Sequence, residues 1–265
     1  MLRHPVVAGM FYDADAHALR KHMEKLLVQK EEKLNARAII VPHAGYVYSG
    51  AVAGEVFSSV RMPDTFIIMG PNHTGAGAPV SVMNKGVWRT PLGDARINSP
   101  LADEIINNSD FAEADTAAHL QEHSIEVQLP FIQALRKSFT FVPITIGTDD
   151  EKVLKETACA IREAMRDKDI LLVSSTDLTH YEGAKDAEKK DNMALKKIEE
   201  VDPEGLADTV NKNSISMCGW MPTYAALYAA RLLGAEKGKI IRYTNSGEAS
   251  GDFGRVVGYG GAAVL

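Results

Sequence analysis

The chain has 265 residues, of which 45 % are apolar and 24 % charged, a composition typical of folded rather than disordered proteins. The net charge of −6 and the lack of a basic stripe argue against nucleic acid as a partner. No apolar run is long enough to cross a bilayer, and no signal peptide is visible. We therefore expect a cytoplasmic protein with no membrane partner, whose Cys159 and Cys218 are buried thiols rather than a disulfide.

Short apolar segments rich in β-branched residues predict seven strands. In chain order they are Ala38–Val41, Thr65–Met69, Val80–Met83, Phe139–Ile146, Ile170–Ser174, Ile240–Tyr243 and Val256–Val264. Several are apolar on both faces, which is typical of the covered strands in a mostly parallel sheet.

Segments with helical period alternate with these strands. Leu19 and Met23 belong to the apolar face of a first helix, and Ser124–Lys137 has the same period, with Pro130 either kinking that helix or marking its start. Thr148–Glu151 has capping-box spacing, and Asp202–Pro203 is typical of a helix start.

The order of these elements predicts one domain rather than two. Strands and helices alternate without a repeat or a long linker, and the charged segment Glu182–Asp191 is interpreted as a solvated loop and helix start. We expect a single α/β domain over residues 1–265, with three layers and a central, mostly parallel sheet flanked by helices.

Histidines follow three of the predicted strands. His43 lies in PHAGY after the strand AIIV, His73 in GPNH after FIIM, and His180 in TDLTHY after ILLVSS. Ligands of open α/β sheets gather beyond the carboxyl ends of the strands. One such histidine is commonly a structural loop residue, but three in equivalent positions favour a metal site, because neutral imidazole is the commonest ligand of transition metals.

A carboxylate ligand is expected from another strand end. Glu248 and Asp252 follow Ile240–Tyr243 in a glycine-containing loop, although a solvated acidic loop is an equal alternative for Asp252. Two histidines with one carboxylate suit ferrous iron, whereas three ligands with a water suit catalytic zinc.

A second polar cluster lies in QEHSIE, residues 121–126. His123 stands where a helix begins and is a candidate for binding substrate or relaying protons, and Glu126 either orients that imidazole or forms a surface ion pair.

Cys218 either lines the pocket or is an inert buried thiol. No dinucleotide fingerprint, P-loop or serine nucleophile elbow is present.

Motifs along nearly the whole chain resemble those of the MEMO family. They include PHAGYVYSG at 42–50, GPNH at 70–73, EHSIEVQLPF at 122–131, SSTDLTHY at 174–181, CG at 218–219 and YTNSGEASGD at 243–252. This family is similar in fold to the class III extradiol dioxygenases, which open catechol rings with non-haem ferrous iron. Animal members place a cysteine in the last of these loops, where this chain has GEASGD.

The resemblance implies roles for individual residues. His43 and His73 fall on the metal-binding histidines of the family, and Glu248 is the candidate third ligand. His180 corresponds to the general base of the dioxygenases and His123 to a substrate-binding histidine. Asp177 is expected to orient His180 or approach the metal.

Three functions follow from this site. The first is an oxidoreductase with Fe(II), or alternatively copper or zinc, acting on an unidentified small molecule or peptide. The second is a zinc-type hydrolase in which the metal activates water. The third is a non-catalytic protein that binds a peptide or small molecule. A homo-oligomer is an open alternative, since α/β enzymes of this size are commonly dimeric.

Overall fold

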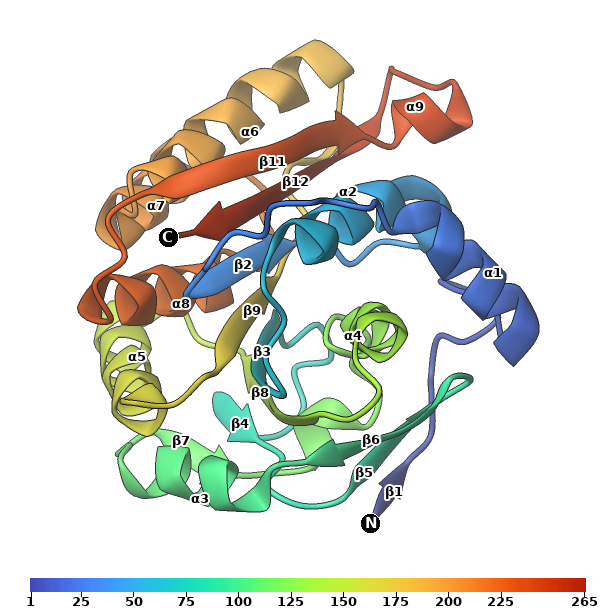
Figure 1. The fold of residues 1–265 in the computed structure, drawn as a ribbon. Helices are drawn as coiled ribbons and strands as arrows, with labels where there is room; N and C mark the ends of the chain where they lie inside the picture. The colour runs from blue at the N-terminus through green and yellow to red at the C-terminus, as the bar shows by residue number, and fades with distance from the viewer.

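Twelve strands form one sheet in the computed structural model, which describes residues 1–265 (Figure 1). The strands are β1 (Leu2–Arg3), β2 (Ala38–Val41), β3 (Thr65–Pro71), β4 (Val80–Val82), β5 (Val87–Thr90), β6 (Gly93–Ile97), β7 (Ala112–Ala114), β8 (Thr140–Ile146), β9 (Leu171–Ser175), β10 (His180–Glu182), β11 (Gly238–Asn245) and β12 (Val256–Val264).

The centre of the sheet is parallel. Strands β6, β8, β3, β9 and β2 lie side by side in this order and run in the same direction. β12 joins β2 in antiparallel orientation and also pairs with β11 and β10. At the other end, β5 is antiparallel to β6, and β1 is parallel to β5. The predicted mostly parallel sheet is confirmed.

Helices cover both faces of the sheet and complete the three layers (Figure 1). They are α1 (Ala16–Leu26), α2 (Tyr46–Ser59), α3 (Ser99–Asn107), α4 (Leu129–Leu135), α5 (Glu151–Met165), α6 (Ala184–Glu199), α7 (Pro203–Lys212), α8 (Trp220–Leu232) and α9 (Gly247–Ser250), with short 3-10 helices at Ala117–His119 and Glu126–Gln128.

Alternation along the strands divides the apolar residues between two cores. In β2, Ala38 and Ile40 pack in the core under α3, α5, α6, α7 and α8, while Ile39 and Val41 pack in the core under α1, α2 and α4. Because successive side chains of a strand point to opposite faces, a strand covered on both sides is apolar throughout. This explains the AIIV pattern of β2.

All seven predicted strands are present, with ends that differ by at most two residues. The strands without a prediction are of two kinds. β5 and β6 form a hairpin that carries exposed charged side chains, so their apolar content is low. β1, β7 and β10 have only two or three residues, too few for a hydrophobic period to appear.

The predicted helix starts are confirmed in two cases and wrong in one. Asp202 caps α7 by accepting a hydrogen bond from the Gly205 backbone N–H, and Pro130 lies in the first turn of α4. α5 is capped by Asp150 and not by Thr148, because the Asp150 carboxylate accepts from the Lys152 N–H.

Two predictions about burial are also corrected. Asp191 lies in α6 and is fully buried, where its carboxylate accepts hydrogen bonds from the Thr179 N–H and the Tyr243 hydroxyl. Cys159 is exposed on α5 rather than buried.

None of the helices combines the length and the apolar character that a membrane span requires.

Three neighbouring strands bring the predicted motifs to one edge of the sheet. β2, β9 and β3 are parallel neighbours, so their carboxyl ends meet at the same edge. The chain continues from β2 into His43, from β3 into His73 and from β9 into Asp177. The topology therefore assembles one site from three distant segments.

Candidate metal centre

His43 is held on two sides at the carboxyl end of β2. Its side chain is buried, its backbone N–H donates to Asp177 Oδ1 at 2.8 Å, and its Nδ1 lies 3.0 Å from Ser175 Oγ. Burial, followed by repulsion from His123 and His73, lowers the pKa of His43 well below its ordinary value. The imidazole is therefore neutral at physiological pH, the form that binds metal ions.

His73 is oriented by a buried carboxylate. Glu122 accepts the His73 backbone N–H at 2.7 Å and the ring Nδ1–H at 2.9 Å, and also the N–H groups of His123 and Ser124 at 2.9 Å each. Burial opposes ionisation of Glu122, but hydrogen bonds led by that of His73 outweigh it and lower its pKa to about 2. Because Nδ1 donates to a carboxylate, the lone pair of His73 is on Nε2.

His123 completes a cluster of three imidazoles. Its ring centroid lies 4.8 Å from that of His73 and 5.4 Å from that of His43, and the latter two are 5.2 Å apart. Phe11 packs edge-on against His123 at 4.9 Å. Burial lowers the pKa of His123 as well, so this ring is also neutral near pH 7.

The Cys218 thiol faces these rings. Its Sγ lies 3.3 Å from His43 Nε2, and the Asp177 backbone N–H donates to the same sulfur at 3.3 Å. Gly219 allows this approach, because a Cβ at that position would lie 2.5 Å from the Ser175 carbonyl oxygen. The ligand atoms of His43, His73 and Cys218 all lie within 4.8 Å of one another, close enough for one ion.

The surroundings of Cys218 do not favour the thiolate form that a free nucleophile needs. Burial, followed by the nearby Asp177 carboxyl, raises the pKa of the thiol well above its usual range. Reactive cysteines instead have a lowered pKa, supplied by a cation, a metal or a helix N-terminus. The thiol would therefore ionise at neutral pH only with a positive charge beside it, which a bound metal ion supplies.

The residues His73, Glu122 and His123 form a second compact group of ligand atoms. Both Glu122 oxygens already accept hydrogen bonds from backbone or ring N–H groups. A carboxylate saturated in this way orients its partners, so we interpret Glu122 as the support of His73 rather than as a ligand.

Asp177 and His180 lie beside the three histidines. Asp177 is buried, and burial raises its pKa to about 6, although the His43 N–H and the charge of His180 act in the opposite direction. His180 begins β10, where a bulge places Tyr181 at a φ of 62°. The His180 Nδ1 lies 2.7 Å from the Leu178 carbonyl and 2.9 Å from the Ser216 carbonyl, so it carries the proton and leaves Nε2 as an acceptor.

Two acidic residues of the predicted site lie elsewhere. Glu248 is exposed in the short helix α9, and Asp252 is exposed just after it. Neither belongs to a group of converging ligand atoms. The structure thus brings together His43, His73, His123 and Cys218, and it leaves Glu248 on the surface.

Glu126 does not orient His123, and neither does it form a surface ion pair. It is fully buried, where it accepts from Arg3 Nη1 and the Tyr12 hydroxyl, each at 2.7 Å, and from the backbone N–H groups of Val6 and Val7. Its role is to fix the N-terminal segment against the loop that carries His123.

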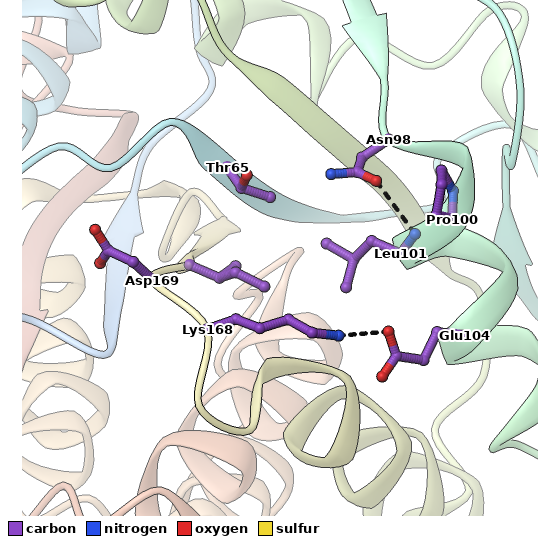
Figure 2. Close-up of a pocket in the computed structure, with 8 residues that line it drawn as sticks. Thr65, Asn98, Pro100, Leu101, Glu104, Lys168 and Asp169 are labelled. Atoms are coloured by element: carbon purple, nitrogen blue, oxygen red, sulfur yellow. Dashed lines mark hydrogen bonds and ion pairs between the residues drawn. The ribbon is translucent and has the colours of Figure 1, made fainter.

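A pocket of about 320 Å³ lies at the opposite edge of the sheet (Figure 2). Thr65 at the start of β3 and Ile170 just before β9 line it, so it is at the amino ends of these strands. Among its polar residues, Lys168 pairs with Glu104, and the Asn98 side chain accepts a hydrogen bond from the Leu101 N–H (Figure 2). This pocket is separate from the histidine cluster.

The sequence profile of the Memo-like protein family matches residues 3–263. The chain belongs to the MEMO family. It is 40 % identical to a MEMO1 family protein of Aquifex aeolicus over all of this chain and 99 % of the relative. It is 39 % identical to a MEMO1 family protein of Methanopyrus kandleri over 98 % of this chain and 97 % of the relative.

Among solved structures, this MEMO family member is similar to an uncharacterized protein from Escherichia coli K12. The TM-score is 0.57 at 13 % identity, over 86 % of this chain and all of the other. At that identity the likeness concerns the fold alone. The family membership and the shared fold agree with the α/β class predicted from the sequence.

Two residues of the site had no predicted role, and the role of a third was left open. Ser175 is hydrogen-bonded to His43 and Glu122 to His73. The sequence does not single these two residues out, because a serine at a strand end and a glutamate before a histidine are common. The position of Cys218 opposite His43 was undecided, because 175 residues separate the two in sequence.

Proposed function

We propose that this MEMO family member is a metal-dependent oxidoreductase whose divalent ion is bound by His43, His73 and Cys218. The observation that carries the proposal is the convergence of two imidazoles and one thiol within 4.8 Å. Both imidazoles contact a hydrogen-bonding side chain through Nδ1, which directs their Nε2 atoms toward a shared ligand.

The donor set suits transition metals such as copper, which is redox-active. Imidazole suits iron, copper and zinc, whereas a thiolate favours copper and zinc over harder ions. With Glu248 as third ligand, Fe(II) is the expected metal; with Cys218 in its place, the preference moves toward copper. A bound copper or iron ion would supply one-electron transfer to or from a substrate.

The surrounding residues supply proton transfer and orientation. His180 Nε2 is free to accept a proton from a substrate, because its Nδ1 is fixed on two backbone carbonyls. Asp177 holds the His43 backbone and thereby the geometry of the first ligand. His123 is partly exposed beside both ligand imidazoles, where it would contact a small molecule or a peptide side chain entering from solvent.

A zinc-dependent hydrolase is the second candidate. Zinc also binds imidazole and thiolate ligands, and catalytic zinc sites use three protein ligands with a water in the fourth position. In that case His180 would accept a proton from a water molecule rather than from an oxidisable substrate.

Metal analysis of protein purified without oxygen tests the proposal. We expect close to one equivalent of copper or iron in the wild type, and loss of that metal in His43→Ala and Cys218→Ala. Cys159→Ala is the matched control, because that cysteine is exposed on α5 and away from the site. Wild-type protein that retains no metal after reconstitution would refute the proposal, and activity restored by zinc alone would select the hydrolase.

A further inference from the structure

A buried hydrogen-bond network lies behind His43, on the side away from Cys218. Its centre is the hydroxyl of Ser175, the last residue of β9, which is fully buried. Three groups lie within hydrogen-bond distance of Ser175 Oγ: His43 Nδ1 at 3.0 Å, Gln128 Nε2 at 2.9 Å and the Ser124 carbonyl oxygen at 2.7 Å.

The protons in this network can be assigned one by one. The Ser124 carbonyl only accepts, so the single hydroxyl proton of Ser175 points to it. The Gln128 amide nitrogen also donates to the Pro42 carbonyl at 2.9 Å, which fixes which end of that amide faces Ser175. Ser175 Oγ therefore has no proton left for His43, and His43 Nδ1 must be the donor.

We propose that Ser175 and Gln128 are positioning residues that hold His43 in its Nδ1–H tautomer. In this tautomer the Nε2 lone pair faces Cys218 and is available to a metal ion. Only this availability to a metal rests on the proposed function. In the other tautomer, the Nε2 proton would occupy that position. Gln128 adds a second restraint, since it also binds the backbone just before His43.

Loss of the Ser175 hydroxyl removes the hydrogen-bond acceptor that favours the Nδ1–H tautomer of His43. The buried Nδ1–H would have lost its acceptor, and a buried donor without a partner is unfavourable. A proton on Nε2 could still be donated to Cys218 Sγ at 3.3 Å. The Ser175→Ala variant should therefore populate the Nε2–H form and bind metal less tightly.

The tautomer is measured directly by ¹⁵N NMR of metal-free protein labelled at histidine. The His43 signals are assigned by their loss in His43→Asn. We expect a protonated Nδ1 and an unprotonated Nε2 in the wild type. An unprotonated Nδ1 in the wild type would overturn the inference, whether or not any variant folds.

Variants then test the role of the hydroxyl. Ser175→Ala should shift His43 toward Nε2–H and weaken cobalt(II) binding by about 10- to 100-fold. Ser175→Thr retains the hydroxyl and should restore both properties. Ser174→Ala is the matched control, because its hydroxyl is equally buried but pairs with Thr223 at 3.0 Å instead of the site. An unchanged tautomer in Ser175→Ala would refute the positioning role.

The two proposals fail in different ways. If wild-type protein binds no cobalt(II), the metal centre is refuted, while the NMR result still decides the tautomer. If wild type binds cobalt(II) but Ser175→Ala binds it equally well with an unchanged His43 spectrum, the metal centre stands and the role of Ser175 is refuted.

Discussion

Replacing Glu126 by glutamine would leave a buried arginine without its counter-ion. Arg3 is fully buried and donates to Glu126 Oε2, to the His119 carbonyl and to the Glu122 carbonyl. Its guanidinium also lies 3.9 Å from the centre of the Trp88 ring. The pair thus connects β1 to the loop that positions the candidate metal ligands.

The structure indicates a large loss of stability. Removing one member of a buried ion pair costs about 3–5 kcal/mol, because the remaining charge stays buried and uncompensated. In glutamine, an amide N–H₂ also replaces one of the two carboxylate oxygens, and both of them accept hydrogen bonds in the wild type. At 2–4 °C per kcal/mol for a chain of this size, the melting temperature should fall by roughly 6–20 °C.

Urea denaturation of metal-free protein, followed by circular dichroism, measures this difference. Glu104→Gln is the matched control, because Glu104 pairs with Lys168 at the surface and surface pairs contribute little. We expect Glu126→Gln to be far less stable than both wild type and control. Equal stability of the two variants would refute the view that Glu126 anchors the N-terminal segment.

Three further variants test other parts of the structure. Glu122→Gln should weaken cobalt(II) binding about 10- to 100-fold by releasing His73, and unchanged titration curves would contradict this role. Burial lowers the pKa of His119 to about 4, so this residue alone should reduce stability by about 3 kcal/mol as pH decreases from 6.5 to 4. In urea titrations across this range, the profile of His119→Gln should be flatter than that of wild type by about this amount, and equal slopes would contradict the prediction. Gly258→Ala would place a methyl group against the Asp191 carboxylate and should cost about 1–3 kcal/mol in thermal unfolding, and an unchanged melting temperature would contradict this.

The parts of the fold that the sequence predicts are those with a repeated physical signal. The covered strands Ala38–Val41 and Thr65–Pro71 are apolar on both faces, and Asp202 before Pro203 defines a helix start. Short strands such as His180–Glu182 lack such a signal, because their pairing depends on the neighbouring strand β12. Asp191 shows the same limit: its charge suggests solvent, but its partners come from distant segments.

The site could be predicted only as far as topology determines it. His43 and His73 follow neighbouring parallel strands, so their proximity follows from the strand order. Cys218 precedes α8, and its approach to His43 depends on the close packing at Gly219. The resemblance to relatives instead directs attention to the loop of Glu248, which is exposed.

The central claim is that His43, His73 and Cys218 bind one metal ion. X-ray absorption spectroscopy of the metal-loaded protein tests it most directly, since sulfur and oxygen ligands give different scattering distances. We predict a sulfur neighbour at about 2.3 Å, as in zinc thiolates, in wild type and Glu248→Gln, and its loss in Cys218→Ser. A wild-type spectrum without sulfur, or one altered by Glu248→Gln, would contradict the account.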